Sequence, residues 1–137
     1  MSSFKILDIA ATGMNAQNLR LNVVASNMAN VDAVSSSIEE TYKSRQPVFR
    51  AMMDQYNPTN PSNGVQMVGI VESKAPLTRE FAPDHPMSDD DGYIYKPNVN
   101  VVEEMANMIS ASRAYQNNVE VVNSARQMMN AVINLGK

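Results

Sequence analysis

The C-terminal segment, residues 98–137, carries the pattern that most constrains this fold. Its apolar residues recur alternately every four and three positions, the heptad spacing of a helix that packs on another helix. A helix over 98–135 is roughly 55 Å long, and its stripe is too long for a compact core in so short a chain. It therefore requires a partner helix. Its apolar members are Val101, Met105, Met108, Tyr115, Val119, Val122, Met129 and Ile133, with Ser112 and Arg126 as the polar positions.

The N-terminal segment, residues 1–30, carries a second stripe with the same spacing, interrupted by Asn18. The two segments predict a mainly α fold, in which long N- and C-terminal helices form a coiled-coil-like pair. The pairing partner is the other helix of the same chain or a helix of another copy. The stripe consists of Phe4, Leu7, Ala11, Met14, Leu21, Ala25 and Met28.

The predicted helix ends are marked by capping residues. Asn100 precedes Glu103 by three positions, which resembles a capping box, and Pro97 stops any earlier helix. Gly136 suits the other end of that helix. Ser2 or Ser3 can cap the N-terminal helix. The helix that begins near residue 100 therefore has a start signal and a stop signal in the sequence.

The middle segment, residues 31–97, contains all seven prolines and the excess negative charge of a chain whose net charge is −3. Proline at this density excludes a continuous helix. We predict a small β-hairpin with long loops that is an insert in one structural domain and not a second core. In order, we expect a mobile polar loop over 31–40, a strand over 41–53, a turn-rich connection over 54–64, a strand over 65–73, an extended loop over 74–92 and a short strand over Tyr93–Tyr95.

The sequence offers no constellation for catalysis, and we predict no enzyme, cofactor or metal site. Cys is absent, which removes thiolate chemistry. The single His85 lies between prolines without an orienting partner. An EF-hand frame on Gly92 fails because it puts Met87 and Asn98 where acidic ligands are needed. The net charge gives no reason to expect nucleic acid, and no apolar run is long enough for a membrane span.

Both terminal segments resemble one family. Residues 19–33, LRLNVVASNMANVDA, resemble the N-terminal signature of the bacterial flagellar rod and hook proteins, and residues 98–136 resemble the matching terminal helix. The insert resembles the proximal rod members over 41–49 and 71–99, so the likeness covers nearly the whole chain. The residues that stand in the family motifs are Asn27, Asn30, Ser110, Arg113 and Tyr115.

This resemblance implies a structural subunit of the proximal rod that polymerises helically into part of the drive shaft and export channel. The implied partners are copies of itself, proximal and distal rod subunits, the adaptor between MS ring and rod, and the flagellar type III export apparatus. It implies export to the periplasmic rod of the basal body without a cleaved signal peptide. The motif asparagines would fix turns or intersubunit hydrogen bonds, Tyr115 would pack, and Arg113 or Arg126 would make a polar contact.

A second hypothesis from a different class also fits two terminal helices and an acidic insert. It is a soluble helical-hairpin adaptor or chaperone of a type III secretion system. An adaptor is expected to stay folded and small in solution, whereas a rod subunit is expected to become ordered in the polymer. We also expect that shortening the serine run Ser35–Ser37 is tolerated, because the run shows no core role in the sequence.

Overall fold

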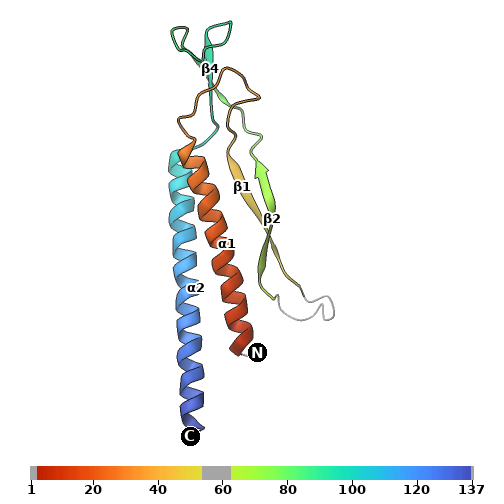
Figure 1. Cartoon of the computed structure of the whole chain (residues 1–137), viewed down its shortest axis with the longest axis vertical. Helices are drawn as coiled ribbons and strands as arrows, with labels where there is room; N and C mark the ends of the chain where they lie inside the picture. Colours follow the sequence, from red (N-terminus) through yellow and green to blue (C-terminus); the bar gives the residue numbers. More distant parts are fainter. Residues whose placement is uncertain (1–2, 54–62, 137) are drawn as a thin grey trace.

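A computed structural model describes residues 3–53 and 63–136 of the chain. The molecule is elongated, with two long antiparallel helices side by side and two small hairpins between them in the sequence (Figure 1). The prediction of two long terminal helices with a small β insert is confirmed, while coiled-coil pairing stays a prediction. The elements are α1 (Ser3–Ala29), β1 (Arg45–Ala51), β2 (Val65–Glu72), β3 (Thr78–Phe81), β4 (Tyr93–Lys96) and α2 (Val101–Leu135).

The start of α2 is fixed by a side-chain cap. Oδ1 of Asn100 accepts from the backbone N–H of Val102 at 3.1 Å and of Glu103 at 3.4 Å. These two bonds satisfy amides that have no partner within the first turn. At the other end, the N–H of Gly136 donates to the carbonyl of Ile133 at 3.3 Å. The predicted boundaries of this helix are therefore correct to within a few residues.

The β1–β2 hairpin lies along the side of α1 that faces away from α2 (Figure 1). Its strands pair antiparallel from Arg45 opposite Glu72 to Ala51 opposite Val65, with an irregularity between Val48 and Phe49. These strands confirm the predictions over 41–53 and 65–73 in shortened form. Most of the predicted connection over 54–64 lies outside the described residues.

The hairpin is attached to α1 near the end where β1 and β2 are connected. Oγ1 of Thr12 accepts from the N–H of Val65 at 3.2 Å and donates to the carbonyl of Ile9 at 2.8 Å. Gly64 has a φ of +130° and packs directly on the Thr12 side chain, so it needs both the positive φ and the absence of a Cβ. These contacts fix the start of β2 on the N-terminal half of α1.

A second two-stranded sheet, β3–β4, lies beyond the C-terminal end of α1 (Figure 1). Strand β4 covers the predicted short strand, but β3 falls in the segment that the sequence predicted as an extended loop. The guanidinium of Arg79 lies 3.6 Å from the centroid of the Tyr93 ring, and the rings of Phe81 and Tyr93 meet edge to face at 5.1 Å. Cross-strand packing of aromatic and cationic side chains therefore holds this small sheet.

The serine run after α1 is not the mobile loop that the sequence predicted. Ser35 is buried and pairs with β4, because its N–H donates to the carbonyl of Tyr95 at 3.1 Å and its carbonyl accepts from the N–H of Tyr95 at 3.0 Å. Its hydroxyl also hydrogen-bonds to Thr41 and to the carbonyl of Ser37. This segment ties the end of α1 to the second sheet, so the premise that the serine run has no core role is wrong, and its shortening is now expected to open that sheet.

Candidate functional site

The junction of both helices with the insert is centred on the Asn27 side chain, which is 1% exposed. Its Nδ2 donates to the carbonyl of Arg45 at 2.8 Å and to Oε1 of Glu104 at 3.0 Å. Its Oδ1 accepts from the hydroxyl of Tyr42 at 2.8 Å and the N–H of Arg45 at 2.9 Å. Both donors and both acceptor positions of the amide are used. One side chain therefore joins α1, α2, β1 and the segment before β1.

Glu104 is a buried carboxyl at the start of α2, with an exposed fraction of 5%. Its Oε1 accepts from Asn27, while Oε2 has no hydrogen-bond partner among the described residues. Burial raises the pKa of Glu104, and the charge of Glu103 adds to this rise, against the lowering effects of the Asn27 hydrogen bond and Arg20. The junction therefore contains an incompletely satisfied acidic group.

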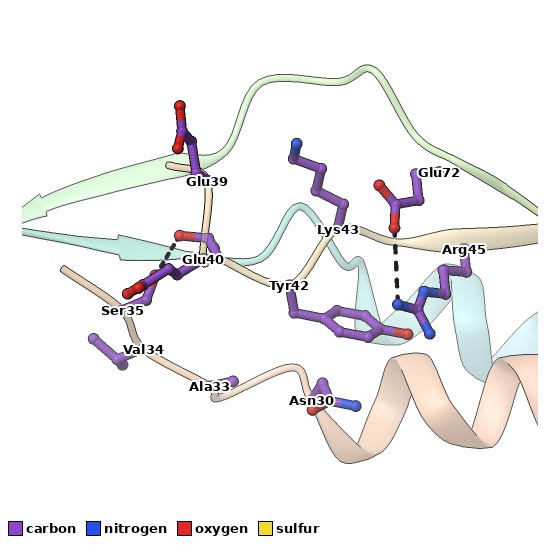
Figure 2. A pocket seen from close by; sticks show the side chains of 11 residues that line it. Asn30, Ala33, Val34, Ser35, Glu39, Glu40, Tyr42, Lys43, Arg45 and Glu72 are labelled. Atoms are coloured by element: carbon purple, nitrogen blue, oxygen red, sulfur yellow. Dashed lines mark hydrogen bonds and ion pairs between the residues drawn. The ribbon is translucent and has the colours of Figure 1, made fainter. Parts of the chain in front are cut away.

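The outer side of the junction is a polar hollow with a volume of about 390 Å³. In Figure 2, Arg45 lies beside the Tyr42 ring, with its guanidinium carbon 5.3 Å from the ring centroid. Arg45 also approaches Glu72 of β2 to 3.8 Å. This pair is about half exposed, so it contributes little to stability. The contacts of Arg45 beside this hollow hold the base of the hairpin against α1. The residues that line the hollow form no catalytic arrangement.

The line along which α1 meets α2 is made of small and polar residues. A Cβ placed on Gly13 would lie 2.9 Å from Nδ2 of Asn118, so the helices approach closely there. Nη2 of Arg20 donates to Oδ1 of Asn107 at 2.9 Å. We call this line, together with the Asn27–Glu104 contact, the polar seam. Its buried apolar members are Ala10, Val24, Ala111 and Ala125.

The predicted apolar stripes lie one residue later in each helix than the polar seam, about 100° further round the helix axis. None of their members is buried within the subunit. The exposed members are Phe4, Ala11, Ala25, Val101, Met105, Tyr115 and Ile133. The half-buried members are Leu7, Met14, Leu21, Met28, Met108, Val119, Val122 and Met129. We call these residues together the apolar stripe; it borders the helix pair and remains open to a partner.

The end of α2 projects beyond α1. The contacts pair Asn27 with Glu104 and Gly13 with Asn118, so the residues of α2 after about 129 pass the first residue of α1 (Figure 1). Ile133 is 62% exposed and Leu135 is 87% exposed on this projection. Large apolar side chains in this position have no covering element within the described chain.

The family-motif residues predicted from sequence lie in three different surroundings. Asn27 bonds to α2, β1 and the segment before β1, and we call it the hub of the junction. Nδ2 of Asn30 donates to the carbonyl of Ser26 at 2.8 Å, a local bond at the end of α1. Ser110 and Arg113 are exposed on α2. Tyr115 is 38% exposed and belongs to the apolar stripe. The structure therefore brings together only the N-terminal motif residues.

Sequence reasoning missed the partners of Asn27. Tyr42, Arg45 and Glu104 lie 15, 18 and 77 positions away from it. No spacing rule links such positions. The one available signal is the pair of adjacent acids at the start of α2, Glu103 and Glu104, but such a pair is equally typical of first-turn charges stabilised by the helix dipole.

Metal clusters and membrane spans are absent from the part of the chain that the structure describes. Within residues 3–53 and 63–136, no cluster of three His, Asp or Glu side chains is arranged to hold a metal ion. In the same part of the chain, neither helix combines the length and apolar character needed to cross a membrane.

Two protein families match the chain. The family described as "Flagella basal body rod protein" matches residues 7–35. The family described as "Flagellar basal body rod FlgEFG protein C-terminal" matches residues 90–135. The matched segments contain most of α1 and nearly all of α2.

Curated relatives match over the full length. The chain is 41% identical over 137 residues to the flagellar basal-body rod protein FlgC of Salmonella typhimurium, covering 100% of both chains. It is 42% identical to the protein of the same name from Escherichia coli, again over 100% of both chains. A relative from Borreliella burgdorferi with this name is 35% identical over 147 residues, covering 97% of each chain.

Proposed function

This chain belongs to the FlgC family of flagellar basal-body rod proteins, and we propose that its helix pair forms part of the core of the proximal rod. It is a structural subunit of the basal-body rod and not an enzyme. In our proposal, residues 1–30 and 98–137 belong to the rod core and residues 31–97 form an insert carried by it.

The observation that carries this proposal is the separation of two contact lines on the same helices. The polar seam joins the helices within one subunit, and the apolar stripe faces outward. Burial of a Val, Leu, Ile or Met side chain contributes about 1.5 to 3 kcal/mol, whereas a typical hydrogen bond contributes about 0.5 to 1.5 kcal/mol. Covering the stripe therefore outweighs the intrachain contacts, and assembly supplies much of the stability of the subunit.

The partners of the apolar stripe are neighbouring rod subunits in this proposal. Helices of adjacent copies, and of other proximal and distal rod subunits, pack in a coiled-coil-like manner on the stripe and on the projecting end of α2. The resulting helical polymer serves as drive shaft and surrounds the export channel. The assembly also contacts the adaptor between MS ring and rod.

The route to the rod is also part of the proposal. The subunit leaves the cytoplasm through the flagellar type III export apparatus without a cleaved signal peptide and is ordered in the periplasmic part of the basal body. Weak internal packing supports this route, because a helix pair held by small and polar residues resists unfolding less than one with a large apolar core.

The test is the composition of purified basal bodies. Hook–basal body complexes freed of membrane and soluble protein should contain peptides of this chain in a low and fixed ratio to other rod proteins, measured by quantitative mass spectrometry. If the chain is absent from them and instead occurs in the soluble fraction bound to export cargo, the adaptor function is correct and the rod proposal is wrong.

A further inference from the structure

We propose that Glu104 is a proton-binding switch at the junction, which retains its proton to higher pH while α1, α2 and β1 are packed around it than when they separate. The carboxyl is 5% exposed, and Oε2 has no hydrogen-bond partner in the described part of the chain. A carboxylate in this position would be buried with a single neutral donor. Because an ionised carboxyl needs full hydrogen bonding or a paired cation, this environment favours the neutral acid.

The charged groups around Glu104 do not provide a paired cation. From α1, Arg20 directs its Nη2 to Asn107 at 2.9 Å. From β1, Arg45 lines a cavity of about 280 Å³ together with Glu104, but its guanidinium approaches Glu72 of β2. From α2 itself, Glu103 adds a like charge. Each nearby cation therefore has another partner, and the nearest acid disfavours ionisation.

The hydrogen bonds of Asn27 also favour the neutral form of Glu104. Asn27 uses its second N–H on the Arg45 carbonyl and both acceptor positions of Oδ1 on the Arg45 N–H and the Tyr42 hydroxyl. It has no further donor to offer to Oε2 of Glu104. The tyrosine hydroxyl, the other titratable group at the hub, is occupied with Asn27 and lies on the opposite side of that amide from Glu104.

The direction of the pH effect follows from the raised pKa of Glu104. Between the ordinary Glu value of 4.5 and the raised value, the packed junction holds a proton that the open junction has released. Glu104 therefore favours packing most below about 4.5, and its contribution is lost as pH rises through the raised pKa. Within this pH interval, a subunit whose helices become ordered on assembly takes up one proton at Glu104 as it enters the rod.

The test uses a full-length chain in which the helix pair is fixed. The chain contains no Cys, so Gly13→Cys with Asn118→Cys adds a single cysteine pair. A Cβ on residue 13 would lie 3.3 Å from Cγ of Asn118, the position that the sulfur atom of a cysteine at residue 118 would take. The two residues are therefore close enough for a disulfide. The oxidised form of this double variant, here called the locked chain, holds α1 and α2 in register at any pH.

The carboxyl carbon of Glu104 is then followed by NMR as a function of pH in the locked chain. We expect its titration midpoint to lie above the ordinary Glu value of 4.5. A midpoint at or below 4.5 would overturn the proposal.

Substitution gives a second readout in the locked chain. The urea midpoint should fall as pH rises through the Glu104 titration, and Glu104→Gln should remove this dependence because its amide stays neutral. The matched control is Glu120→Gln, an exposed change further along α2, which should keep the dependence of the parent. If Glu104→Gln retains the full dependence, the proton is bound elsewhere and Glu104 is not the switch.

Discussion

Asn27 and Glu104 lie 77 residues apart in the chain, and the amide of Asn27 donates to Oε1 of Glu104 across 3.0 Å. This contact joins the C-terminal end of α1 to the N-terminal end of α2, the two ends that the insert connects. The same amide bonds the backbone of Arg45 from both sides. The insert, α1 and α2 therefore share one buried point of attachment, and disturbance of this point should affect all three.

Removal of the hub amide is expected to be costly. Asn27→Ala in the locked chain leaves the Tyr42 hydroxyl, the Arg45 backbone and the Glu104 carboxyl without their partner, and we expect a loss of about 2 to 4 kcal/mol in the free energy of urea unfolding. The matched control is Asn30→Ala, which removes one bond to the Ser26 carbonyl and should cost about 1 kcal/mol or less. Equal losses in the two variants would contradict the hub.

Shortening of the serine run is expected to open the second sheet. Deletion of Ser35–Ser37 removes both backbone bonds between Ser35 and Tyr95 and the hydroxyl contacts of Ser35. We expect faster hydrogen exchange of the Tyr95 amide, which loses its acceptor. Glu39→Gln, an exposed change in the same segment, should leave the Tyr95 amide as protected as in the parent. Unchanged protection after the deletion would show that another element holds β4.

Acid is expected to loosen the connection between β3 and β4. Oδ1 of Asp89 accepts from the N–H of Tyr93 at 2.7 Å and of Asp91 at 3.0 Å, and Oδ2 accepts from the Tyr95 hydroxyl at 3.2 Å. The Tyr93 bond is the main cause that lowers the pKa of Asp89 below its ordinary value of 3.8. The stabilisation is therefore present above about 3.8 and is lost as pH falls through the lowered pKa.

The measurement is the NMR titration of the Asp89 carboxyl carbon. Its midpoint should lie below the ordinary Asp value of 3.8, and the Tyr93 amide should lose its exchange protection in the same range. An Asp89 midpoint at or above 3.8 would exclude this role of the carboxylate.

A charge on the apolar stripe is expected to block rod assembly without separating the helices. Tyr115→Asp places a carboxylate where a neighbouring helix is proposed to pack, and burial of an unpaired charge is strongly unfavourable. Cells that carry the variant should be non-motile and should lack rods in electron micrographs. When Tyr115→Asp is introduced into the locked chain, the disulfide should still form. Asn117→Asp, two residues along and away from the stripe, should assemble. Normal rods from Tyr115→Asp would remove this residue from the interface.

The sequence predicted those elements whose signals are local. Heptad spacing, the Asn100 cap and the prolines were sufficient to locate both helices and the two longer strands. Strand β3 was missed because its pairing with β4 depends on tertiary contacts of Arg79 and Phe81, and not on an apolar alternation of its own. Ser35 was interpreted as loop for the same reason, since its partner Tyr95 lies far along the chain.

The contact line of the helix pair could not be predicted from apolar spacing. The heptad pattern identified the apolar stripe correctly as a regular feature, but the contacts within the subunit use Gly13, Arg20 and Asn27 one position earlier. Small and amide residues allow close approach and specific hydrogen bonds, and neither property is visible in a hydrophobic pattern. The stripe and the seam were therefore distinguishable only in three dimensions.

The most direct test of the rod-core proposal is photo-crosslinking from the apolar stripe in assembled rods. A photoreactive residue at Met105, in cells where this chain is the only copy, should give crosslinks to a second rod subunit in purified basal bodies. The same residue at Asn117 should give few. If Met105 crosslinks only within its own chain, or to no rod protein while rods are intact, the stripe does not face neighbouring subunits and the proposal is contradicted.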